Sequence, residues 1–90
     1  AALDELEDTL PALGTVESEY ECRELSDGIN RFLRQLPKED RYLFVRRYYF
    51  GDSLNDLASQ TGRTPHGISV RLFRVREKLQ KNLRKEGLLS

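Results

Sequence analysis

The chain has 90 residues, of which 33% are charged and 38% hydrophobic, and its formal net charge at pH 7 is zero. A chain of this length forms one domain with a modest core, because it buries only about 60 to 65% of the surface that its unfolded form exposes. No apolar run approaches the roughly 20 residues of a membrane span, and the acidic start has neither the basic nor the apolar part of a signal peptide. We therefore expect a cytoplasmic domain, cut from a longer protein because position 1 is not methionine.

The charges are unevenly distributed along the chain. Residues 1 to 36 hold nine acids and three bases, whereas residues 63 to 90 hold two acids and eight bases. Lysine and arginine release condensed counterions when they approach phosphates, so the basic end is expected to meet an acidic partner such as nucleic acid. A solvated amphipathic helix is the alternative explanation.

The first firm helix is expected to begin at Ser18, which stands at capping-box spacing from Glu21, and to end before Pro37. Residues 1 to 17 show little apolar periodicity and mix acids with turn-forming residues, which predicts an acidic linker or weakly held arm.

A second helix is expected from about Lys38 to Phe50, with a broad apolar and aromatic surface. Seven of its thirteen residues are apolar, too many for one stripe about 100° wide. Burial in a small bundle would explain this surface, and docking on a partner protein is the alternative. The candidates for docking are Phe44, Tyr48, Tyr49 and Phe50.

The next 30 residues predict a helix-turn-helix. Ser53 and Asp56 stand at capping-box spacing before a helix over 54 to 61, and Gly62 can take the left-handed conformation that ends it. Thr64 then caps a longer helix, with Pro65 at its first position. The fold class is therefore all-α: a small four-helix domain over residues 18 to 86 with a C-terminal helix-turn-helix, followed by a tail over 87 to 90.

The last helix, expected from 65 to about 85, has an inward and an outward face at 100° per residue. The inward face holds Ile68, Leu72, Val75, Leu79 and Leu83. The outward face then presents Phe73 and Arg74, with His66, Val70 and Glu77. Arginine can donate two hydrogen bonds to guanine, and an exposed aromatic ring can contact thymine methyls, so both side chains are candidates for reading bases.

The turn before this helix is suited to a phosphate oxygen. The positive end of the helix dipole lies there, close to Arg63 and Thr64. His66 could donate to a phosphate from the same turn, and a surface histidine without a ligand is the alternative.

Enzyme chemistry finds little support in this sequence. Cys22 and His66, the only cysteine and the only histidine, have no third member at a catalytic or metal-binding spacing. There is no glycine-rich phosphate loop. We expect no catalytic activity, no metal, no cofactor, no small-molecule substrate and no membrane contact.

Several motifs taken together resemble the C-terminal promoter-binding region 4 of bacterial sigma-70 family factors, in particular the extracytoplasmic-function type. They are Leu36-Pro37-Lys38-Glu39-Asp40-Arg41, the pair Arg47-Tyr48, residues 53 to 58, and residues 71 to 79. The resemblance implies that the last helix enters the major groove of the −35 promoter element. It also implies that an apolar surface docks on the flap of core RNA polymerase, and that an anti-sigma factor can cover these surfaces.

By position, the resemblance implies a set of contacts to DNA. The base-reading set is Ser69, Val70, Phe73 and Arg74, and the phosphate contacts are Arg47, Arg63, Thr64 and Arg71. The chain departs from the common family pattern at His66-Gly67 and at Ser69-Val70, which bears on the preferred DNA sequence.

Two other functions remain as alternatives. One is a protein-interaction module that docks through its aromatic second helix and barely touches DNA. The other is the output domain of a response regulator, against which the Leu36-Pro37 entry and the acidic segment argue.

Overall fold

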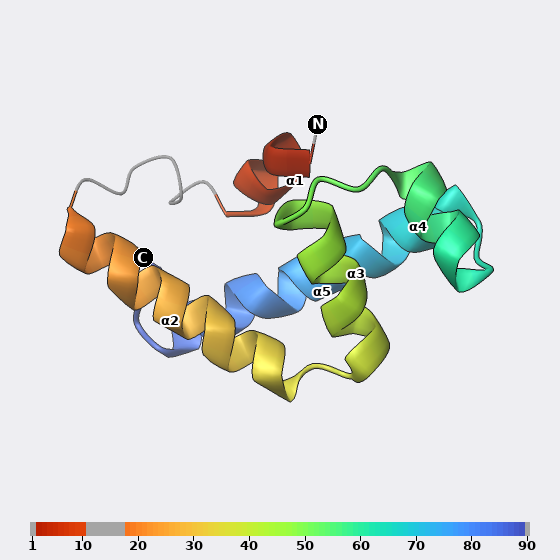
Figure 1. Ribbon diagram of the computed structural model, residues 1–90. Coiled ribbons are helices and arrows are strands. Elements are labelled where there is room, and N and C mark those ends of the chain that lie inside the picture. The colour runs from red at the N-terminus through yellow and green to blue at the C-terminus, as the bar shows by residue number, and fades with distance from the viewer. Residues whose placement is uncertain (1, 11–17, 90) are drawn as a thin grey trace.

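Helix α5 is the axis of the fold, because each of the other four helices packs against it or against its neighbour α3. The computed structural model describes residues 2–10 and 18–89. These residues form α1 (Ala2–Thr9), α2 (Glu19–Gln35), α3 (Lys38–Tyr48), α4 (Leu54–Thr61) and α5 (Pro65–Lys85), with no strand among them (Figure 1). In Figure 1, α3 crosses in front of α5, while α2 and α4 lie toward its two ends. No helix in the described part of the chain has the length and apolar character needed to span a membrane.

The caps predicted from the sequence set the helix boundaries. The hydroxyl oxygens of Ser18, Ser53 and Thr64 each accept a hydrogen bond from a backbone N–H three residues later, at 3.1, 3.0 and 3.0 Å. Gly62 ends α4 with φ +71°, in the left-handed region. The all-α prediction with a C-terminal helix-turn-helix, formed here by α4 and α5, is therefore confirmed.

The predicted inward stripe of α5 lies in the core along its whole length. Ile68 and Leu72 belong to a cluster with Leu43 of α3 and Leu57 and Ala58 of α4. The second half of the stripe belongs to another cluster, which joins α2, α3 and the residue after α1: Leu10, Leu25, Phe32, Leu33, Leu36, Phe44, Val75, Leu79 and Leu83. Tyr48 packs against both clusters, so α3 joins the two parts of the core.

Residues 2 to 10 lie within the segment for which the sequence predicts an acidic linker or weakly held arm. They form α1, which packs against α3 and α5, and the Leu10 side chain that follows it is fully buried. Leu6 and Leu10, four residues apart, face the core together, and this spacing is the signal that the acidic composition of the segment concealed. Residues 11 to 17 lie outside the described residues, and the domain boundaries at 17 and 86 stay predictions.

The structure also corrects one predicted docking residue. Phe44 is 1% exposed and packs edge-on against Tyr48, with 4.8 Å between the ring centroids. A ring in this position cannot contact a partner protein. Burial in the bundle therefore explains part of the apolar surface of α3. The apolar residues of this helix pack into both core clusters.

Gly62→Ala should lower the free energy of unfolding by about 1 to 2 kcal/mol, because a Cβ atom is strained in the left-handed region. Open space surrounds the Cα of Gly62, so backbone strain is the only cost. For a domain of this size, each kcal/mol corresponds to a fall in Tm of about 4 to 8 °C. Ser59→Ala, an exposed position on α4, is the control and should change stability by less than about 0.5 kcal/mol in a thermal melt.

Candidate nucleic-acid interface

The first half of α5 presents an exposed strip between two flanks. Phe73 is 48% exposed, and Arg74 and His66 are exposed beside it, as the sequence predicts. Ser69 and Val70 are half-buried. The orientation follows from the burial of Ile68, Leu72 and Val75, since residues on the opposite side of a helix must face outward.

One flank of the strip is basic and concave. Four residues predicted to contact DNA line the same hollow, of about 490 Å³: Arg63, Val70, Arg71 and Arg74. They come from the turn and from α5, and Asp40 of α3 closes the hollow behind them. The structure thus brings together two phosphate candidates and two base-reading candidates.

Carboxylates at the start of α3 hold the two arginines of this hollow in place. Arg63 Nε lies 2.5 Å from Glu39 Oε1, and Arg71 Nε lies 2.5 Å from the buried Asp40 Oδ1. Arg71 also reaches Glu39 at 3.3 Å. The hydrogen bond from Arg63 and the charges of both arginines lower the pKa of the Glu39 carboxyl, so it is ionised at neutral pH. These pairs orient the guanidinium groups before any ligand arrives.

The opposite flank of the strip is formed with α1. Phe73 and Glu77 of α5 line a second hollow, of about 380 Å³, together with Glu5, Asp8 and Thr9. The Arg76 guanidinium lies 5.6 Å from the centre of the Phe73 ring. The base-reading set therefore divides: Val70 and Arg74 face the basic hollow, and Phe73 faces the acidic helix.

Beneath α1, the Glu5 carboxylate is the centre of a polar network. Arg47 donates to it from Nη2 and Nε at 2.7 and 3.3 Å, and the Tyr48 hydroxyl donates at 3.1 Å. Arg76 donates to the Tyr48 oxygen at 2.6 Å and approaches Glu5 at 3.5 Å. The Arg47 and Arg76 side chains are only 11% and 10% exposed. Arg47, predicted to contact a phosphate, is thus occupied by a carboxylate of the same chain.

This environment changes two pKa values. Partial burial raises the pKa of Glu5, but hydrogen bonds from Arg47 and Tyr48 and the charges of Arg47 and Arg76 outweigh it, and the net pKa is lowered. Burial raises the pKa of Tyr48 to about 12. At neutral pH, Glu5 is therefore an anion and Tyr48 a neutral hydroxyl that donates to it.

The turn before α5 has the geometry expected of a helix N-terminus. The Thr64 hydroxyl accepts from the Gly67 N–H, and His66 is exposed one turn before Val70. The first N–H groups of α5 have no helical partner and carry the positive end of its dipole, which suits an anionic oxygen.

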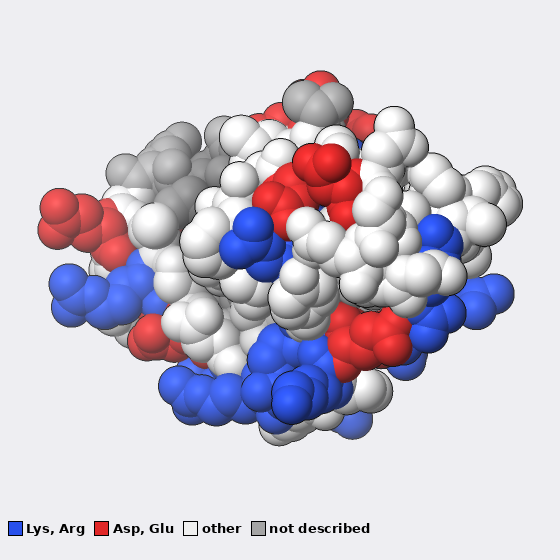
Figure 2. All heavy atoms as spheres, turned by 45° about the vertical axis from the view of Figure 1, so that its right-hand side comes forward, with Lys and Arg blue, Asp and Glu red and all other residues white. Residues whose placement is uncertain are grey.

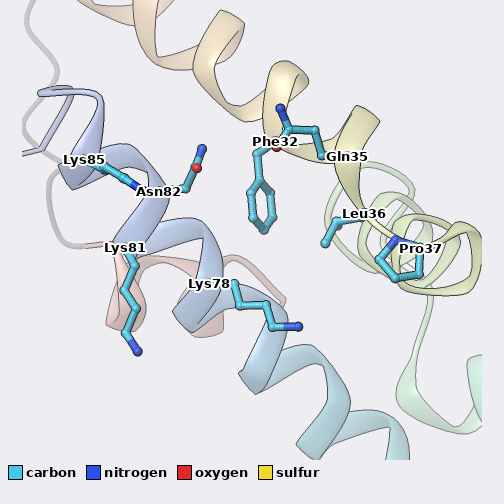
Figure 3. A pocket seen from close by; sticks show the side chains of 8 residues that line it. All are labelled: Phe32, Gln35, Leu36, Pro37, Lys78, Lys81, Asn82 and Lys85. Atoms are coloured by element: carbon cyan, nitrogen blue, oxygen red, sulfur yellow. The ribbon is translucent and has the colours of Figure 1, made fainter.

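A groove that the sequence did not indicate lies between the end of α2 and the second half of α5. Its volume is about 410 Å³, and Figure 3 shows the Phe32 ring pointing from α2 toward α5, with Leu36 and Pro37 to its right. Lys78, Lys81 and Lys85 line the α5 side with Asn82. The lysines are spaced three and four residues apart, and this spacing could have predicted that they share one face of α5. The sequence could not predict the apolar floor of the groove, because those residues come from α2, which is distant in the chain.

Two of the predicted docking residues remain available to a partner. Tyr49 and Phe50, after the end of α3, are exposed, and the Arg46 guanidinium lies 4.4 Å from the centre of the Phe50 ring. Tyr48 is half-buried, and its hydroxyl is engaged in the network described above. Figure 2 shows lysine and arginine gathered along the lower edge of one face of the molecule, with carboxylates above them.

Comparison with known families identifies this arrangement of helices. The family model described as Sigma-70, region 4, matches residues 26–79, which is more than half of the chain. The chain belongs to the sigma-70 region 4 family. The match begins within α2 and ends within α5, so it includes the helix-turn-helix and leaves α1 outside. Comparison with curated proteins and with solved structures finds no match.

The sigma-70 region 4 family recognises the promoter −35 element as part of sigma factors, and its members are DNA-binding components of transcription initiation. In DNA-binding helix-turn-helix proteins the second helix lies in the major groove, and α5 is the second helix of the motif in this chain. In the part of the chain that the structure describes, no three histidine, cysteine or acidic side chains are placed to hold a metal ion.

Acidification should weaken the contact of α1. Ionised Glu5 has a lowered pKa in the folded chain, so its stabilisation is present above the ordinary value of 4.5 and is lost as the pH falls through the lowered value. Urea unfolding at pH 7 should show Glu5→Gln to be less stable than the wild type by about 1 kcal/mol. As the pH falls through the lowered pKa of Glu5, this difference should shrink toward zero. Glu7→Gln, an exposed position on the same helix, is the control, and an equal pH effect there would contradict the assignment.

Proposed function

We propose that this sigma-70 region 4 domain reads a −35-like promoter element through the first half of α5, as the part of an RNA polymerase sigma factor that directs transcription initiation in the cytoplasm. The observation that supports this function best is the exposed strip with Phe73 and Arg74 beside the basic hollow of Arg63 and Arg71. A helix with its side chains is about 10 to 12 Å wide, which matches a major groove about 12 Å wide.

Within the groove, the side chains have different roles. Arg74 donates two hydrogen bonds to guanine O6 and N7, and Phe73 packs against a thymine methyl group. Ser69 and Val70, half-buried beside the strip, shape the contact with neighbouring bases. The departures at His66-Gly67 and Ser69-Val70 lie at the start of the helix, so they alter which bases are preferred.

The phosphate contacts come from groups that are already paired. Arg63 and Arg71 exchange Glu39 for a phosphate oxygen when DNA binds. This exchange costs little free energy, because the Arg63–Glu39 pair is exposed to solvent. Thr64, His66 and the N–H groups at the start of α5 hold the phosphate next to the turn. These contacts fix the position of the helix and carry no base information.

A second surface serves assembly with polymerase. The groove beside Phe32 offers an apolar floor with lysines along its edge, and Tyr49 and Phe50 extend the apolar surface at the end of α3. We assign docking on the polymerase flap to these surfaces, where an anti-sigma factor would compete. A function in protein docking with little DNA contact is the alternative, whereas the family match argues against a response-regulator output domain.

Arg74→Ala should remove discrimination at one base pair, by about 1 to 3 kcal/mol, because the bidentate contact to guanine is lost. The measurement is fluorescence anisotropy with duplexes selected from a random pool, compared with duplexes changed at single positions. Lys85→Ala, an exposed base in the last turn of α5, is the matched control and should leave the preference unchanged. If Tyr49→Ala abolishes activity with polymerase while Arg74→Ala leaves duplex preference intact, the docking alternative is correct.

Arg63→Ala should weaken binding to all duplexes alike. The arginine contacts only the backbone, so the slope of log affinity against log salt should become shallower by about 0.9. Titrations at several salt concentrations, on the preferred duplex and on one of scrambled sequence, measure both effects. A loss confined to the preferred duplex would show instead that Arg63 reads a base.

A further inference from the structure

The donors that meet at Glu5 form a site for an anionic oxygen. Arg47, Arg76 and Tyr48 come from two different helices, and their nitrogen and hydroxyl groups converge on one carboxylate or on one another. A carboxylate and a phosphodiester both offer negatively charged oxygens that accept strong hydrogen bonds from arginine. Two guanidinium groups and a hydroxyl can therefore hold a phosphodiester oxygen as well as a carboxylate. Glu5 therefore occupies a ready-made anion site.

This anion site lies next to the exposed strip of α5. Phe73 lies between them, since it belongs to the exposed strip and also lines the hollow that contains Glu5, Thr9 and Arg76. A helix that fills the major groove has a phosphate strand on each side. In the proposed binding mode, the basic hollow lined by Arg63 and Arg71 faces one of these strands. The other flank should face the second strand, but α1 places Glu5 and Asp8 there.

Helix α1 is suited to leave this position. It has eight residues, too few for a stable isolated helix, and four of them are acidic with no basic residue. The contacts that attach it include Leu6 and Leu10 in the core and Glu5 in the network. They also include Thr9, which accepts from Arg76 through its hydroxyl and from Gln80 through its carbonyl.

We propose that α1 is an acidic lock on a second phosphate-binding site, formed by Arg47, Arg76 and Tyr48. This proposal rests on the proposed function in DNA recognition. In the locked state, Glu5 takes the place of a DNA phosphate, and the acids of α1 repel the backbone. When α1 leaves, both guanidinium groups face the second strand, and DNA stabilises this open state because it has more contacts there. The affinity of the domain for duplex DNA therefore rises with the fraction of open molecules.

The experiment compares Glu5→Gln with Glu7→Gln in the full 90-residue chain. Both variants remove one negative charge from α1, but only Glu5 contacts the arginines. Glu5→Gln should bind duplex DNA about three- to tenfold more tightly than Glu7→Gln. Its salt dependence should be steeper by about 1 to 2 in the log–log slope, because Arg47 and Arg76 gain phosphates. Amide hydrogen exchange of α1 should become faster in Glu5→Gln and should not change in Glu7→Gln.

Leu6→Ala provides a test without any change of charge. It weakens the packing of α1 on the core and should also bind DNA more tightly, with the same steeper salt dependence. A purely structural role for Glu5 would lower the folded fraction, and so weaken binding in both variants without a steeper slope. That result, or equal affinities and slopes for Glu5→Gln and Glu7→Gln, would overturn the lock. If neither the wild type nor the variants bind any duplex, the proposed function fails as well.

Discussion

The apolar stripe of α5 is the constraint on which the rest of the structure depends. Five residues from Ile68 to Leu83 are fully or almost fully buried, and both clusters of the core form around them. Because the helix is packed along one side for its whole length, its other side cannot rotate away from solvent. The exposure of Phe73 and Arg74 is therefore a consequence of core packing on the opposite side of the helix.

The arginines of this domain join its helices through carboxylates of the same chain. Arg63 and Arg71 join the start of α3 to the helix-turn-helix through Glu39 and Asp40, and Arg47 and Arg76 join α1 to α3 and α5 through Glu5. A net charge of zero is thus compatible with a nucleic-acid interface, since the acids that balance the bases also orient them. Exchange of an internal carboxylate for a phosphate retains the charge pairing and adds the release of counterions from DNA.

The two flanks of α5 differ in how easily a phosphate can replace the carboxylate that is paired with the arginines. Glu39 and Arg63 are both well exposed, so a phosphate can replace the carboxylate with little rearrangement. Glu5 is held over nearly buried guanidinium groups by the packing of Leu6 and Leu10, so its replacement requires the whole of α1 to move. In the proposed mechanism, the same chemistry provides an open phosphate contact on one side of α5 and a regulated phosphate contact on the other.

The sequence by itself determined the local structure: the caps at Ser18, Ser53 and Thr64, the left-handed Gly62, and the inward stripe of α5 each depend on residues within one or two turns of each other. It also predicted the fold class and the exposed pair Phe73 and Arg74. Tertiary structure alone decided that Phe44 is buried, that Glu5 meets Arg47 across 42 positions of sequence, and that Phe32 faces the lysines of α5. Those contacts join helices far apart in the chain, and helical periodicity indicates which face of a helix is apolar without indicating which helix covers it.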